Sequence, residues 1–354
     1  MRPGRRARRR ATSSKRPRSS ASRLRSTRGC RPGSQAMALE DDYSGHKGFD
    51  PAFLSAGNAD GRVFLPALGP ALAKEATTLS GNPKETVLKY RNFSVVMHRL
   101  RRFAIYSAAN VDFKGRFELA RPKDRWRFDP RIPTEMQVGE SFYTNNAFDR
   151  GHLTRREDQE YGPTPKEAID AAADTCHWTN CMPQHARFNE RRELWQGIEH
   201  HILEEAVAKD QFRAQVITGP VFDAADPVLA GFEATPYPLR FWKVVAAINA
   251  SGKLFATAYV LDQRDTIAEF GLRGAPEVPF TPFKTYQTTI AAIEKLTQLT
   301  FTGSRGARRT NLGAFDPLAR RKAGAGLGDR SVPSAPGDEP MVPLTRLDQV
   351  VLHA

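Results

Sequence analysis

Three long runs of β-branched and aromatic residues constrain the fold of this 354-residue chain more than any other feature. The runs are Ala214–Gly219, Phe241–Ile248 and Leu254–Leu261. Residues of these types favour strands, because branched and aromatic side chains pack well on a pleated surface. The three runs therefore predict a central antiparallel β-sheet.

Two shorter apolar runs predict a hairpin at which the core begins. Phe93–Met97 and Phe103–Tyr106 are joined by a short basic link. Two strand-like runs with so short a connection are typical of a β-hairpin. We expect this hairpin to join the same sheet.

Helices are predicted in three segments. Ala168–Ala173 forms a short helix after a loop containing Gly and Pro, and Thr288–Leu299 forms the last helix. Between them lies an amphipathic helix, which places on one face the apolar residues Leu194, Ile198 and Ile202. Helices that flank an antiparallel sheet give the fold class α+β.

The net charge of +14 is concentrated at one end of the chain. Residues 1–36 carry 13 of the 53 Lys and Arg residues and no acidic residue, which leaves 40 basic against 39 acidic residues from Met37 onward. The overall charge therefore says nothing about what the folded part binds. A hydrophobic content of 40% is enough for a real core.

Four regions are expected along the chain. Residues 1–36, rich in Arg and Ser, are predicted to be disordered because they have little apolar surface to bury. A transit peptide, a nucleic-acid-binding arm and translation from a start upstream of Met37 all fit this composition, and we favour the last two. Frequent Gly and Pro predict a loop-rich arm at 37–83. The folded domain follows at 84–315, and a flexible tail at 316–354.

The sequence carries no evident membrane or export signal. No apolar run is long enough to cross a bilayer, and the N-terminus lacks the apolar region of a secretory signal. Cys30 lies in the basic terminus, while Cys176 and Cys181 can either pair or stay free. Localisation and redox compartment therefore stay open.

The stretch Asp149-Arg-Gly-His152 has the residue types of a phosphate-handling site. His152 can serve as a general base, because the pKa of an imidazole lies near neutrality. Arg150 offers a planar fork of donors to phosphate oxygens, and Gly151 allows the backbone to approach a ligand closely or to adopt a conformation closed to other residues. The alternative is a surface ion pair of Asp149 and Arg150 beside an ordinary histidine.

A basic strip precedes this motif. The segment Arg99–Arg127 contains nine basic residues and three acidic ones. A phosphate-binding strip and a solvated surface both fit this pattern, and the solvated surface is the commoner case. Trp126 and Phe128, which alternate with arginines, fit either base stacking or packing.

Several motifs in order resemble the DNA/RNA non-specific endonuclease family, the sugar-non-specific nucleases with a ββα-metal (His-Me finger) site. After Asp149-Arg-Gly-His152 come Thr179-Asn-Cys-Met-Pro-Gln184, Phe188-Asn189 and Trp195-Gln-Gly-Ile-Glu199, all within about fifty residues. The flanking sequence from Lys84 to Leu312 is similar to the same domain. The region 84–315 is therefore expected to be the endonuclease domain.

The resemblance implies a Mg²⁺-dependent endonuclease, with Mn²⁺ or another divalent cation as alternatives. It implies that His152 activates water, that Asn189 binds the metal ion directly and that Arg150 contacts phosphate. It further implies that Asn180 helps to hold the site together and that Glu199 holds metal-bound waters. A hard cation such as Mg²⁺ keeps most of its waters, so few protein oxygen ligands are enough.

The sequence departs from the family pattern at the metal site. Asn189 and Trp195 lie six residues apart, a longer spacing than the family's usual one. Glu190 and Glu193 therefore compete with Glu199 for the role of the acid.

The resemblance also implies an upstream phosphate-contacting arginine, for which Arg125 and Arg127 are alternatives. DNA and RNA are the implied partners. An inhibitor protein and a homodimer are open alternatives, and a membrane partner is not expected.

Other interpretations compete with the nuclease. Four residues can be combined on paper into a zinc site, but their spacing lacks the usual paired element; they are Cys176, His177, Cys181 and His185. A non-catalytic nucleic-acid-binding module that uses Arg99–Arg127 is a second alternative. A phosphodiesterase of narrower substrate range is a third.

Overall fold

The computed structural model describes most of the chain from residue 42 onward. The described ranges are 42–55, 62–120, 123–186, 198, 201–202, 205, 213–272, 284–305, 308–320 and 340–352. All of them lie in one compact unit, Asp41–Ala354. Among these residues, no helix is both long and apolar enough to span a bilayer.

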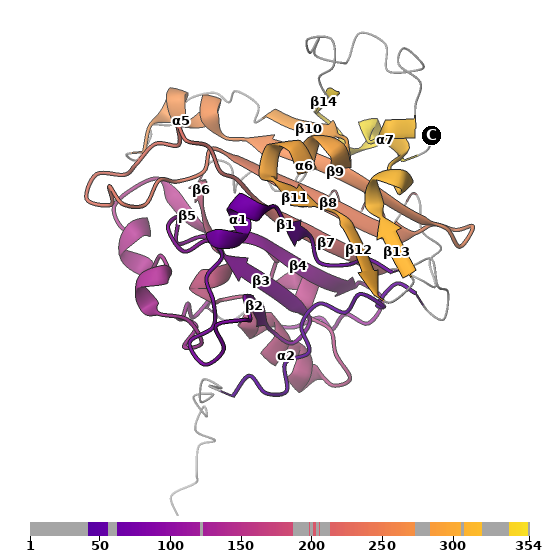
Figure 1. Cartoon of the computed structure of the whole chain (residues 1–354), viewed down its shortest axis with the longest axis horizontal. Helices are drawn as coiled ribbons and strands as arrows, with labels where there is room; N and C mark the ends of the chain where they lie inside the picture. Colours follow the sequence, from indigo (N-terminus) through magenta and orange to yellow (C-terminus); the bar gives the residue numbers. More distant parts are fainter. Residues whose placement is uncertain are drawn as a thin grey trace, which may run out of the picture. The chain divides into compact units, whose positions relative to one another are not determined.

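An antiparallel sheet of eight strands forms the centre of the molecule (Figure 1). The strand order is β14-β10-β9-β8-β7-β4-β3-β2, and every neighbouring pair is antiparallel. The strands are β2 (Val87–Lys89), β3 (Phe93–Met97), β4 (Ala104–Asp112), β7 (Arg213–Val221), β8 (Arg240–Ile248), β9 (Leu254–Asp262), β10 (Lys284–Thr288) and β14 (Met341–Leu344). The fold is α+β, and the predicted central antiparallel sheet and its hairpin β3–β4 are confirmed.

Helices and three small strand pairs surround this sheet. The helices are α1 (Pro70–Lys74), α2 (Pro165–Asp174), α5 (Arg264–Phe270), α6 (Ile290–Thr297) and α7 (Pro317–Arg320). The small pairs are β1 (Ala67–Leu68) with β11 (Leu299–Thr300), β5 (Phe148–His152) with β6 (Cys181–His185), and β12 (Thr302–Arg305) with β13 (Arg308–Asn311). Short 3-10 turns include η3 (Glu140–Tyr143) and η5 (Trp178–Asn180).

Both faces of the sheet are buried, because its long strands are apolar on both sides. In β8, Phe241 and Val245 pack into one core cluster, while Trp242 and Val244 pack into another. The second cluster also takes residues of α6 and β11. The first takes the hairpin β5–β6, so this hairpin lies on the opposite face from α6.

The predicted helices are found with adjusted limits. α2 begins at Pro165, three residues before the predicted start, because Thr164 caps it by accepting a hydrogen bond from the backbone N–H of Glu167. Of the amphipathic helix, residues 198, 201, 202 and 205 are described, and all are helical. Ile198 and Ile202 are both fully buried in the first core cluster, as predicted for its apolar face.

The expectation of a flexible tail at 316–354 is wrong for the part that the structure describes. β14 pairs with β10 as the edge strand of the sheet, and Val342 and Leu344 are buried. The backbone N–H of Val351 donates to the side chain of Gln287 at 2.7 Å. The Arg-, Ala-, Gly- and Pro-rich composition of the whole segment concealed this four-residue strand.

Candidate active site

The motif Asp149-Arg-Gly-His152 forms strand β5 of a small antiparallel hairpin. Gly151 pairs with Met182 and His152 with Cys181 on β6. Side chains alternate between the two faces of a strand, so Arg150 and His152 lie on one face and Asp149 and Gly151 on the other. Phe148, at the start of the strand, is buried and fixes the hairpin to the core.

Asn180 joins the end of the motif to the start of β6. Its side-chain oxygen accepts from the backbone N–H of Thr154 at 2.9 Å, and its amide donates to the carbonyls of Thr154 at 2.9 Å and Thr175 at 3.0 Å. The hydroxyl of Thr154 lies 2.6 Å from that of Ser107 on β4. Asn180 is fully buried, so these bonds hold the chain after His152 against the central sheet.

Gly151 has a packing reason for lacking a side chain. A Cβ atom at this position would lie 2.2 to 2.6 Å from side-chain atoms of Gln184, which crosses the strand there. Gly151 is absent from the residues with positive φ. The glycine is therefore required for the close approach of Gln184 and not for an unusual backbone conformation.

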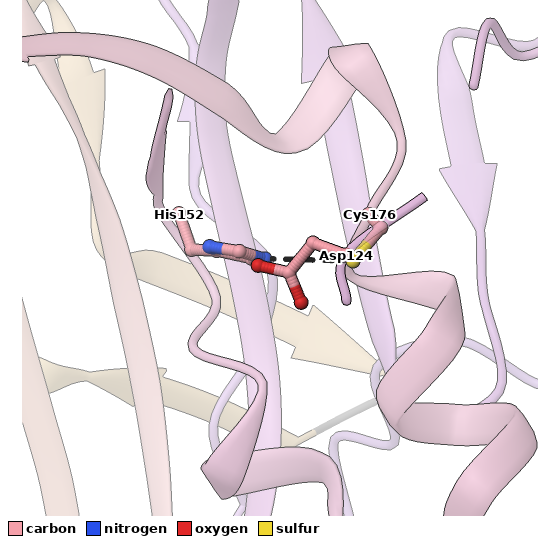
Figure 2. A group of neighbouring side chains, drawn as sticks. All are labelled: Asp124, His152 and Cys176. Carbon is pink, nitrogen blue, oxygen red and sulfur yellow. Dashed lines mark hydrogen bonds between the residues drawn. The ribbon is translucent and has the colours of Figure 1, made fainter. Parts of the chain in front are cut away.

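His152 is surrounded by three side chains that the sequence did not single out as a group. Its Nε2 atom lies 3.8 Å from Sγ of Cys176, and its ring packs against Trp126 with centroids 4.6 Å apart. Potential metal-ligating atoms of Asp124, His152 and Cys176 all lie within 4.8 Å of one another. Figure 2 shows the carboxylate and the sulfur facing the imidazole ring.

The predicted arginines occupy different environments. Arg150 is exposed and pairs through Nη1 with both carboxylate oxygens of Glu140 at 3.0 Å. Arg127 turns inward: its Nε donates to Nε2 of His177 at 2.9 Å, and its Nη2 lies 3.3 Å from Asp174. Arg125 is exposed.

Burial determines the protonation of the groups beside the motif. Burial, and after it the charge of Arg127, lower the pKa of His177 to about 4. Nδ1 of His177 lies 2.7 Å from the carbonyl of Asp174 and therefore carries the proton in the neutral ring. Burial raises the pKa of the Cys176 thiol, and Asp124 adds to this effect.

The combination of Cys176, His177, Cys181 and His185 does not form a zinc site. Both cysteines are free and buried. Nε2 of His185 lies 3.0 Å from the carbonyl of Gly271 and so has a different partner from Cys176. In the part of the chain that the structure describes, the metal-ligating group that includes Cys176 contains Asp124 and His152 instead.

The predicted metal-site residues Asn189 and Glu199 lie outside the described residues, and so do the competitors Glu190 and Glu193. The neighbouring helical positions Ile198 and Ile202 belong to the same core cluster as Phe148 of the hairpin. The helical positions Ile198 and Ile202 therefore pack on the same core as the hairpin that carries His152.

Comparison with known proteins places the chain in a family. The family model described as DNA/RNA non-specific endonuclease matches residues 72–305, well over half of the chain. The chain belongs to this family. The match spans every residue that the sequence predicts for the site, from Arg125 to Glu199.

Two further similarities accompany the family match. The chain is 35% identical over 246 residues to "Uncharacterized protein y4fB" of Sinorhizobium fredii (strain NBRC 101917 / NGR234), covering 67% of this chain and 36% of that protein. The chain thus spans about a third of the length of this curated relative. A crystal structure of the EndoG/EndoGI complex has 18% sequence identity and a TM-score of 0.45, covering 61% of this chain and 85% of that chain.

The sequence motifs identify Arg150 and His152, but they do not identify the side chains that surround His152. Trp126 was noted only as a stacking or packing residue, and it contacts the ring of His152. Asp124 and Cys176 lie 28 and 24 positions from His152 in the sequence, on separate segments. No local pattern marks such a convergence.

Proposed function

We propose that this protein is a metal-dependent endonuclease that hydrolyses phosphodiester bonds in DNA and RNA, without preference for sugar or sequence. One observation carries the proposal: a chain of this nuclease family presents Arg150 and His152 on one face of a hairpin that Asn180 braces. A site of this kind addresses phosphate and sugar, which are common to all nucleic acids.

His152 acts as the general base in this proposal. The imidazole takes a proton from the attacking water, and such a base contributes about 10²–10⁴-fold to the rate. The side chain is neither fully buried nor fully exposed, so it reaches solvent. Contact with Trp126 on its ring limits the orientations of the imidazole.

Arg150 and Arg125 bind phosphate in this proposal. The ion pair of Arg150 with Glu140 leaves 44% and 60% of the two side chains exposed. An exposed pair of this kind is worth about 0–1 kcal/mol, so a phosphate can replace the carboxylate at little cost. Arg125 is preferred to Arg127 as the second arginine, because Arg127 already binds His177 and Asp174.

Asn189 and Glu199 would hold the metal ion, directly and through waters. Their amide and carboxylate oxygens are donors that suit Mg²⁺ or Mn²⁺. When bound, such an ion neutralises negative charge on the phosphate. Glu190 and Glu193 are the alternatives to Glu199. An inhibitor protein and a homodimer stay predictions.

Digestion of supercoiled DNA, linear DNA, single-stranded DNA and RNA, each with Mg²⁺ and with Mg²⁺ plus EDTA, tests the proposal. We expect EDTA-sensitive internal cleavage of all four substrates. His152→Ala should lower the rate by about 10²–10⁴-fold with nucleic-acid binding retained. Binding without cleavage would favour the non-catalytic module, and cleavage of one substrate alone would favour the narrower phosphodiesterase.

A further inference from the structure

Three side chains of different donor type, one of which is the proposed base His152, converge in the fold. Asp124 lies near the end of the basic strip Arg99–Arg127, His152 ends β5, and Cys176 follows the end of α2. Their ligating atoms lie within 4.8 Å of one another, and Nε2 of His152 is 3.8 Å from Sγ of Cys176. Figure 2 shows the three groups pointing toward a common point.

We propose that Asp124, His152 and Cys176 form a binding site for Zn²⁺, separate from the site of the activating metal ion. Thiolate sulfur, imidazole nitrogen and carboxylate oxygen are the three donor types that zinc takes in proteins, and three protein ligands leave a fourth position for water. Mg²⁺ prefers oxygen donors, so the thiol excludes it from this position.

The distance between the sulfur and nitrogen donors is close to that in a zinc centre. With Zn–S of about 2.3 Å and Zn–N of about 2.0–2.1 Å, a tetrahedral angle separates sulfur and nitrogen by about 3.6 Å. The observed separation between Sγ of Cys176 and Nε2 of His152 is 3.8 Å. On binding, the Zn–S bond forms as the thiol proton leaves to solvent. The thiolate and the carboxylate then offset the charge of the ion.

The surroundings hold the cluster in place. Arg156, which is only 4% exposed in its side chain, lies 3.8 Å from the carboxylate of Asp124. Its Nε lies 4.0 Å from Glu160, which balances its charge near the site. Trp126 packs against the ring of His152. These contacts restrain Asp124 and His152 beside Cys176, whose sulfur lies 3.8 Å from Nε2 of His152.

Zinc bound at this position prevents His152 from acting as a base, a consequence that rests on the proposed function. An imidazole bound to zinc through Nε2 carries its proton on Nδ1, so neither nitrogen can accept a proton from water. Zn²⁺ is therefore expected to inhibit cleavage that Mg²⁺ supports, without competing for the Mg²⁺ ligands.

Cobalt substitution tests the site without any assay of activity. In full-length protein carrying Cys30→Ser, Co²⁺ should give a thiolate-to-cobalt charge-transfer band that one equivalent of Zn²⁺ removes. Cys176→Ser should abolish the band. Cys181→Ser is the matched control, because Cys181 is also a free buried thiol, and it should keep the band. A band that survives Cys176→Ser, or no band in the parent protein, would overturn the proposal.

Cleavage assays test the consequence. Loss of an outer-shell partner costs about 10–100-fold in metal affinity, so loss of a direct ligand should raise the half-inhibitory Zn²⁺ concentration at least about tenfold. Cys176→Ser should show this rise and Cys181→Ser should not. Should Cys176→Ser fail to fold by circular dichroism, Asp124→Asn replaces it, and unchanged Zn²⁺ affinity in that variant refutes the site. Absence of all cleavage would contradict the proposed function, while the cobalt spectra would still decide the zinc site.

Discussion

Replacement of Asn180 by alanine is expected to damage both stability and cleavage. Asn180 is fully buried, and its side chain makes three hydrogen bonds to the backbone of Thr154 and Thr175. Alanine leaves the N–H of Thr154 without this acceptor and removes one donor from each carbonyl. His152 lies two residues before Thr154, so the loosened segment is the one that positions this proposed base.

The magnitude follows from these bonds. A buried donor without a partner costs about 1–3 kcal/mol, and the two carbonyl bonds contribute about 1 kcal/mol each or less. We therefore expect Asn180→Ala to lower the free energy of unfolding by about 2–4 kcal/mol. For a domain of this size the corresponding fall in Tm is roughly 4–8 °C. Because His152 is the proposed base, a displacement of about 1 Å at this residue is expected to reduce the rate by about 10²-fold.

Thermal unfolding and Mg²⁺-dependent cleavage measure the two effects. Asn249→Ala is the matched control, because Asn249 accepts hydrogen bonds from the backbone N–H of Ser251 and Lys253 in the turn between β8 and β9. This turn is open to solvent, so water can replace the lost bonds. The control should cost less than about 1 kcal/mol and leave cleavage unchanged. A variant Asn180→Ala with the Tm and cleavage rate of the wild type would refute the bracing role.

Three further outcomes are expected. Gly151→Ala should destabilise the fold by about 1–3 kcal/mol through overpacking against Gln184, and Gln184→Ala should relieve it; additive losses in urea titrations would contradict this. Because the pKa of His177 is lowered to about 4, His177 is protonated in the unfolded chain but stays neutral in the folded chain between pH 6.5 and 4. The free energy of unfolding should therefore fall by about 3 kcal/mol as pH falls from 6.5 to 4. Urea titrations in which His177→Asn keeps the full pH dependence would contradict this. Asn189→Ala should reduce cleavage, and raised Mg²⁺ should restore it only partly; full activity at low Mg²⁺ would move the metal ligand elsewhere.

The sheet was predictable because its strands are long and locally consistent. Continuous apolar runs such as Phe241–Ile248 favour strands by residue type, and burial on both faces explains why they do not alternate with polar residues. The short strands at Phe148–His152 and Met341–Leu344 were not predicted. Each is defined by its pairing partner, β6 or β10, and five or four residues carry too little periodicity to reveal it.

The site was predictable only where its residues are adjacent in the sequence. Arg150 and His152 stand out because their motif is compact. Asp124 and Cys176 reach His152 through the tertiary fold, and neither has a local signal. The arginine alternatives were likewise undecided in sequence, since only the fold shows that Arg127 binds the buried pair His177 and Asp174.

One face of β5 carries the two proposed site residues of the motif, and the other face carries Asp149 and Gly151. Arg150 and His152, on one face, are accessible for chemistry. On the other face Gly151 admits the side chain of Gln184, which lies in register opposite Asp149. The four residues Asp149–His152 are therefore not all proposed catalytic groups. Because Gln184 belongs to the second motif, the glycine ties the two motifs together, and substitutions at Gly151 should act through the packing of the hairpin and not through the reaction itself.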